Sequence, residues 1–127
     1  MNLEKVIFAF FIVLALTLNF GFVMGDMDNP EHHNAFELFA ALVVSLIATV
    51  LKFGDRTHIG AVLLATSLVA DLQLVIATLF WGWVEYGGGG GMTSRYMADI
   101  VSLAGGALVA NVASVVILIT ETVMLRR

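Results

Sequence analysis

Asp71 is the residue whose type and position are best suited to chemistry in this chain. It lies near the middle of residues 59–84, an apolar run in which it is the only charged residue. A carboxylate at the centre of a membrane span costs about 2.5 to 3.5 kcal/mol on insertion scales, so something must compensate it. Asp71 is therefore predicted to be a cation or proton site. The alternative is a carboxyl group, ionised or protonated, that is hydrogen-bonded between helices.

Other polar residues of the apolar runs complete this candidate ion or proton site. Ser67 and Thr78 are spaced four and seven residues from Asp71, which places all three near one face of a helix, while Gln73 points away from that face. Asn111, near the middle of the last apolar run, can hydrogen-bond to Asp71 or Gln73. Asn111 has a packing role as its alternative, because interhelical amides also stabilise helix pairs.

Small residues recur every four positions in the last apolar run. Such spacing lets a second backbone approach closely, so it predicts helix packing rather than catalysis. The residues of this stripe are Ser102, Gly106, Ala110 and Ser114.

Two histidines and two acids precede and open the second apolar run. His33 and Glu37 are four residues apart and can share a helix face, and His32 and Glu31 lie beside them, so a metal site is one interpretation. The alternative is a solvated helix start whose acids interact with the positive end of the helix dipole. Protonation of the histidines would make this loop sensitive to pH under either interpretation.

The composition predicts that membrane-spanning helices position these residues. The 127 residues are 60% hydrophobic and 13% charged, with a mean hydropathy of +0.97 and no cysteine. Soluble domains are about half apolar and a quarter charged, so the chain is predicted to be an all-α integral membrane four-helix bundle. The single transmembrane domain, residues 1–127, has its spans at about 5–25, 35–53, 59–84 and 97–122. A cleaved signal peptide is the alternative for the first span.

Turn and cap residues separate the spans. Asn29 and Pro30 form an N-cap and first-turn pair before the second helix. Residues 54–58 combine a helix stop with a new N-cap, which predicts a tight hairpin between the second and third spans. The five glycines of residues 87–91 predict a flexible connection, after which Thr93 or Ser94 caps the last helix.

The basic residues divide five to one between the two sides of a four-span protein. Since basic residues favour the cytoplasmic side, both termini are predicted to be cytoplasmic. Only Arg95 lies on the outer side. The five inner residues are Lys5, Lys52, Arg56, Arg126 and Arg127.

Charge and motifs exclude several functions. The net charge of −4 and the lack of a basic stretch give no electrostatic basis for binding nucleic acid. No nucleophile elbow, HExxH sequence or P-loop is present, so we expect neither an enzyme nor a cofactor.

Four segments of the chain resemble a family of short four-span proteobacterial inner-membrane proteins of unassigned function. The segments are MNLEK at residues 1–5, NPEHHN at 29–34, LKFGDRT at 51–57 and ADLQ at 70–73. The resemblance implies a bacterial inner-membrane location but no activity.

We therefore expect a small membrane protein involved in cation transport, either as the path or as a subunit that modulates a channel or transporter. Its expected partners are the lipid bilayer, a monovalent cation or proton, and further copies of itself or a larger membrane protein. The alternative is a structural or assembly subunit with no transport activity.

Overall fold

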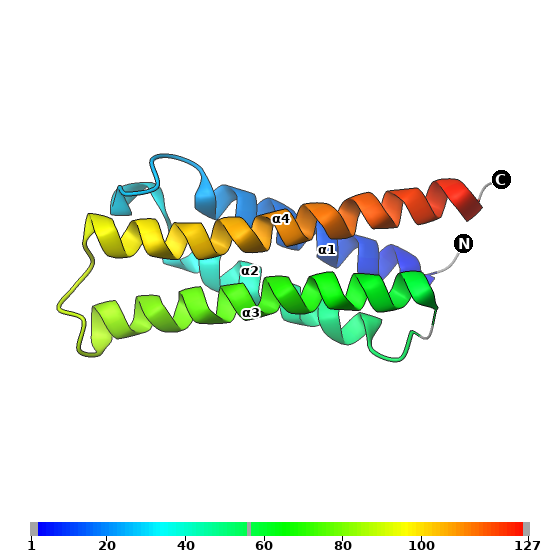
Figure 1. The fold of residues 1–127 in the computed structure, drawn as a ribbon, viewed down its shortest axis with the longest axis horizontal. Helices are drawn as coiled ribbons and strands as arrows, with labels where there is room; N and C mark the ends of the chain where they lie inside the picture. The colour runs from blue at the N-terminus through cyan, green and yellow to red at the C-terminus, as the bar shows by residue number, and fades with distance from the viewer. Residues whose placement is uncertain (1–2, 56, 126–127) are drawn as a thin grey trace.

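The computed structural model describes residues 3–55 and 57–125. Its elements are α1 (Leu3–Val23), the short 3-10 helix η1 (Pro30–His32), α2 (Ala35–Lys52), α3 (His58–Tyr86) and α4 (Ser94–Leu125). The four α-helices run up and down alternately, with both termini and the α2–α3 turn at one end of the bundle (Figure 1). Arg56, Arg126 and Arg127, which contribute to the predicted orientation, lie outside the described residues, as do Met1 and Asn2.

All four helices are long and apolar enough to cross a membrane. The bundle interior buries only 28% to 39% of the most apolar window of each helix, so most of these side chains face outward. Contiguous apolar surface of this extent is typical of lipid contact. The predicted all-α membrane four-helix bundle is confirmed, and the chain is a multi-pass membrane protein.

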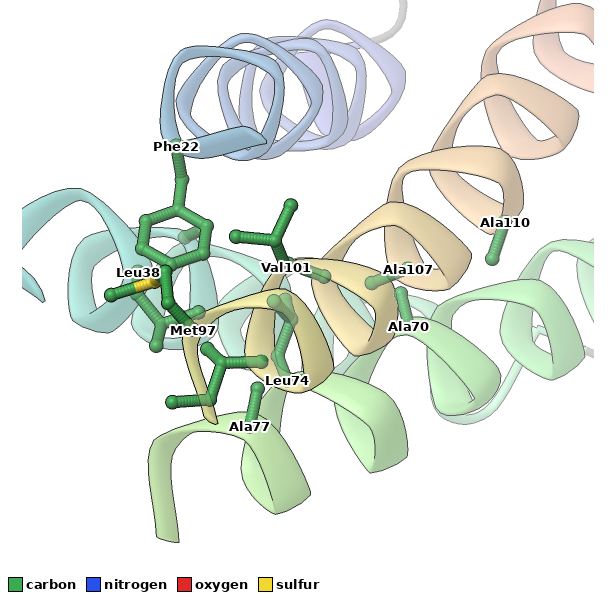
Figure 2. Close-up of a cluster of buried hydrophobic side chains, with 12 residues drawn as sticks. Phe22, Leu38, Ala70, Leu74, Ala77, Met97, Val101, Ala107 and Ala110 are labelled. Atoms are coloured by element: carbon green, nitrogen blue, oxygen red, sulfur yellow. The ribbon is translucent and has the colours of Figure 1, made fainter. Parts of the chain in front are cut away.

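Two apolar clusters form the interior of the bundle. One cluster, which we call the outer cluster, lies at the end of the bundle that carries the glycine-rich connection. It contains Phe22, Leu38, Leu74 and Met97, with alanines of α3 and α4 between these helices (Figure 2). The other, which we call the inner cluster, lies toward the opposite end and contains Phe8, Ile12, Ala48 and Leu63. Alanine lets two helix backbones approach closely, and α3 and α4 form the most extensive helix pair of the fold.

Helix ends follow the predicted turn chemistry with one correction. Asn29 caps the short helix η1 rather than α2: its Oδ1 accepts from the Glu31 N–H at 3.0 Å, and α2 begins only after a second cap, Asn34, whose Oδ1 accepts from the Phe36 N–H at 2.8 Å. Both asparagines can cap a helix, and it is Asn34 that caps α2. The Thr93 cap of α4 is confirmed, since its hydroxyl accepts from the Tyr96 N–H at 3.1 Å.

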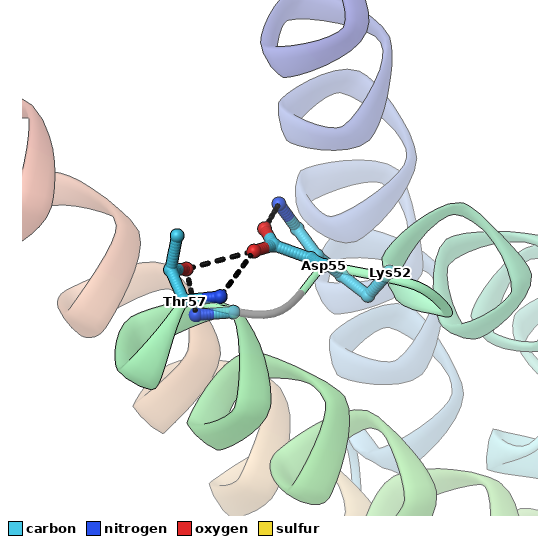
Figure 3. Close-up of polar contacts among 4 residues, drawn as sticks. Lys52, Asp55 and Thr57 are labelled. Carbon is cyan, nitrogen blue, oxygen red and sulfur yellow. Dashed lines mark hydrogen bonds and ion pairs between the residues drawn. The ribbon is translucent and has the colours of Figure 1, made fainter.

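The α2–α3 turn is built around Asp55. Its Oδ1 accepts from the Thr57 N–H at 3.0 Å and from the Thr57 hydroxyl at 2.7 Å, and its Oδ2 lies 3.4 Å from the Lys52 ammonium (Figure 3). Thr57 in turn caps α3, because its hydroxyl oxygen accepts from the Gly60 N–H at 2.9 Å. The hydrogen bonds from Thr57, with a smaller contribution from the Lys52 charge, hold the pKa of Asp55 below its ordinary value.

Asp55→Asn is expected to lower the thermal unfolding midpoint at neutral pH by a few degrees. Because the pKa of Asp55 is lower in the folded protein, its ionised carboxylate stabilises the folded state fully above the unfolded pKa of about 4. This stabilisation is lost as the pH falls through the folded-state pKa. The difference between the parent and Asp55→Asn should therefore shrink below about pH 4. Melting curves across a pH series measure it, with the exposed Asp99→Asn as the matched control. A difference that stays constant down to acidic pH would refute this account of the turn.

Candidate functional site

Asp71 is held by two hydroxyl groups of the neighbouring helix α2. The Ser45 hydroxyl lies 2.6 Å from Asp71 Oδ1 and the Thr49 hydroxyl is hydrogen-bonded to Oδ2. The Asp71 side chain is buried, with 6% of the residue exposed. Because both partners belong to α2, the carboxyl group connects α2 to α3 in the interior of the bundle.

Ser45 and Thr49 were not among the predicted site residues. They are four residues apart on α2, so they lie on one helix face, and that face is turned toward α3. The two hydroxyls interrupt an otherwise apolar stretch at helical spacing, which is the feature of the sequence that could have identified them.

Asp71 belongs to a group of buried polar side chains on α2, α3 and α4 near the boundary of the two apolar clusters. We call this group the polar layer. Its members are Ser45, Thr49, Ser67, Asp71, Asn111 and Ser114.

The predicted partners Ser67 and Asn111 lie in the polar layer without hydrogen bonds. Both are completely buried, and the Ser67 hydroxyl and both amide atoms of Asn111 have no hydrogen-bond partner among the described residues. Asn19 of α1, which the sequence analysis did not single out, is in the same state. Buried polar groups are nearly always paired in proteins, so these side chains are suited to bind water or an ion.

Thr78 lies apart from Asp71, nearer the C-terminal end of α3. Thr78 lines a groove of about 500 Å³ between α2 and α3, together with Phe36, Trp81 and Tyr86 among others. Its hydroxyl is buried and has no hydrogen-bond partner among the residues that the structure describes. The structure thus brings Ser67 into the polar layer with Asp71 and leaves Thr78 in a separate groove.

Gln73 points toward α4, where it covers Gly106. A Cβ atom placed on Gly106 would come within 1.9 Å of Gln73 Oε1, so the glycine makes room for the amide. Of the other stripe residues, Ala110 and Ser114 are buried, and the Ser114 hydroxyl is 2.6 Å from that of Thr66 on α3. Ser102 is exposed.

Gly106→Leu is expected to destabilise the α3–α4 pair by about 1–3 kcal/mol, the usual cost of overpacking. Val116→Leu is the matched control on the same helix, because Val116 is 55% exposed and added bulk there should change the free energy of unfolding by less than about 0.5 kcal/mol. Equilibrium unfolding in detergent compares the two variants. Equal effects would remove the argument that Gly106 is a packing residue.

The histidines of the α1–α2 loop are occupied by hydrogen bonds. The two ring nitrogens of buried His33 face the carbonyl oxygens of Phe22, at 2.5 Å, and Asp26, at 2.8 Å. Both ring nitrogens are therefore turned toward backbone oxygen atoms and not toward a metal position shared with the other predicted ligands. His32 Nδ1 accepts from the Asp26 N–H at 2.8 Å.

The predicted metal ligands do not converge. Glu37 lies over Gly21 of α1, where its Oε2 is 2.3 Å from the position that a Cβ atom would take. Across residues 3–55 and 57–125, no three His, Cys, Asp or Glu side chains are grouped as a metal ion requires. Glu31 is exposed in η1.

A bundle of four membrane-spanning helices with a carboxyl group in an internal polar layer defines a small multi-pass membrane protein. The chain belongs to the family of unknown function DUF6394, which it matches over residues 32–122. This agrees with the resemblance to a family of unassigned function. No curated protein and no solved structure matches the chain.

Proposed function

We propose that this protein takes part in cation movement across a membrane, as the path itself or as a subunit that modulates a channel or transporter. The observation that carries the proposal is the buried carboxyl group of Asp71 within a membrane-spanning helix. The recorded hydrogen bonds of this carboxyl group are to the uncharged hydroxyls of Ser45 and Thr49. Ionisable groups inside membranes usually mark ion or proton pathways.

The unpaired polar groups support a path rather than an isolated carboxyl. Ser67 and Asn111 belong to the same polar layer as Asp71, and Asn19 is buried on α1 toward the outer cluster. Each can bind a water molecule or an ion in transit. They would offer an ion or a water molecule polar contacts near Asp71 inside the bundle.

The outward apolar surface supports assembly with lipid and with further protein. Exposed branched side chains follow one another along α4 at Val109, Val112, Val116, Ile119 and Val123. We propose a homo-oligomer or a complex with a larger membrane protein, located in a bacterial inner membrane. Four helices leave little room for an aqueous path within one chain, so assembly would widen it.

A structural or assembly subunit without transport is the second proposal. It is favoured by the two hydrogen bonds through which Asp71 joins α2 to α3, because interhelical bonds of this type stabilise membrane bundles by about 1 kcal/mol each. No chemical reaction is assigned to the chain under either proposal.

Both termini are proposed to be cytoplasmic, and single cysteines can test this because the parent has none. Gly88→Cys should react with an impermeant thiol reagent from outside, since an added Cβ there meets only Trp83 Nε1, at 3.6 Å. His58→Cys, at the start of α3 beside the α2–α3 turn at the other end, should react only after the membrane is opened. Labelling of Gly88→Cys from the cytoplasmic side alone would reverse the orientation.

Reconstitution into lipid vesicles tests the transport proposal. Vesicles containing the purified parent should pass protons, sodium or potassium faster than protein-free vesicles, alone or together with a membrane protein that copurifies with the chain. A parent that leaves all three fluxes unchanged in both preparations would leave the structural role as the function.

A further inference from the structure

The oxygen atoms around Asp71 form three close contacts that each require a hydrogen. Ser45 Oγ is 2.6 Å from Asp71 Oδ1, Thr49 Oγ1 is bonded to Asp71 Oδ2, and Thr49 Oγ1 is also 3.0 Å from the Ser45 carbonyl oxygen. The two hydroxyl groups supply one hydrogen each, while an ionised carboxylate and a carbonyl oxygen supply none. With an ionised Asp71, the Thr49 hydroxyl hydrogen would have to be shared between Asp71 Oδ2 and the Ser45 carbonyl oxygen, which weakens both bonds.

A proton on Asp71 Oδ2 supplies a third hydrogen, so that each contact has its own. Oδ2–H then donates to the Thr49 hydroxyl oxygen, the Thr49 hydroxyl donates to the Ser45 carbonyl, and the Ser45 hydroxyl donates to Oδ1, which is the carbonyl oxygen of the acid. Each donor has one acceptor, and no hydrogen is shared. A metal ion beside the carboxylate would add no hydrogen, so the Thr49 hydrogen would remain shared between two acceptors.

The burial of Asp71 and its uncharged hydrogen-bond partners also favour a protonated carboxyl group. Asp71 is 6% exposed, and its recorded side-chain hydrogen bonds are to the neutral hydroxyls of Ser45 and Thr49. Isolated buried charges are costly enough that such groups tend to neutralise instead. A neutral carboxylic acid meets this requirement without a counterion.

We propose that the cation taken up at Asp71 is a proton, held in a hydrogen-bonded chain from Asp71 through Thr49 to the Ser45 carbonyl. This inference rests on the proposed function and specifies its ion. Release of the proton removes one hydrogen from the chain, so the Thr49 hydroxyl must turn from the Ser45 carbonyl to the carboxylate. Loading and unloading thus alter the contact between α2 and α3.

Infrared spectroscopy of the purified protein tests the inference without any flux measurement. The spectrum should contain a carboxylic acid carbonyl band that is absent from Asp71→Asn and retained in Asp99→Asn. Ser45→Ala should move the band to higher frequency, because Oδ1 loses its hydrogen-bond donor. Thr120→Val, which removes a lipid-exposed hydroxyl bonded only to the Val116 carbonyl at 2.8 Å, should leave the band in place.

Two outcomes would overturn the inference. One is a parent without this band at every pH at which it stays folded. The other is a band that disappears when sodium or potassium is added, because a metal ion would then replace the proton. A band that persists in both salts, in a protein that transports nothing, would uphold the proton on Asp71 while refuting the transport proposal. Failure of the inference and failure of the proposed function are therefore distinguishable.

Discussion

Asp71→Leu is expected to destabilise the bundle by about 1–3 kcal/mol, the usual cost of leaving buried polar groups unpaired. The change removes both oxygen atoms that the Ser45 and Thr49 hydroxyls contact on α3. Thr49 keeps its alternative bond to the Ser45 carbonyl, so Ser45 should bear most of the loss. Unfolding in detergent, followed by loss of helicity, measures the free energy.

A compensating variant makes this stability prediction specific. Replacing both partners of a buried hydrogen bond by apolar groups is often nearly neutral. Asp71→Leu combined with Ser45→Ala and Thr49→Val should therefore recover much of the stability that Asp71→Leu loses. A triple variant less stable than Asp71→Leu alone would contradict the assignment of the loss to unpaired hydroxyls.

Asp71→Asn is expected to fold like the parent and to lose cation flux. The amide has nearly the size of the carboxyl group and keeps one acceptor oxygen for Ser45, while its NH₂ can donate to the Thr49 hydroxyl oxygen. It cannot be ionised, so it can neither take up nor release a proton. Unfolding of the same preparation used for transport shows whether the fold is retained, and the flux shows whether the ionisable group is needed.

The number of helices could be predicted from the sequence because membrane spans need only length and hydropathy. The four helices overlap the predicted spans at about 5–25, 35–53, 59–84 and 97–122, with α4 the most extended at Ser94–Leu125. The start of α2 was less predictable. Asn29 with Pro30 and Asn34 both satisfy the local requirements of a cap, and tertiary contacts of the loop, among them the hydrogen bonds of His33, decide between them.

The burial of Asp71 could be predicted from the cost of a carboxyl group in a membrane, but its partners could not. Which side chains meet across two helices depends on their relative rotation and depth, and these are set by the packing of the whole bundle. Ser45 and Thr49 therefore had no distinguishing feature beyond their spacing. Asn111, which local reasoning placed beside Asp71 or Gln73, makes no described hydrogen bond to either.

The stripe of small residues shows a limit of spacing arguments. Four residues exceed one helical turn by about 40°, so a stripe of four-residue steps rotates by about 120° between Ser102 and Ser114. In the structure Ser114 is buried and Ser102 is exposed. The alanines that line the core of α4, Ala104, Ala107 and Ala110, follow three-residue steps instead.

The most direct test of the central claim compares proton flux through vesicles that contain equal amounts of folded parent, Asp71→Asn or Asp99→Asn. Asp99 is an exposed acid near the start of α4, so its substitution removes the same charge outside the bundle interior. The account predicts that the parent and Asp99→Asn conduct alike and that Asp71→Asn falls to the level of protein-free vesicles. A folded Asp71→Asn protein that conducts like the parent would contradict it.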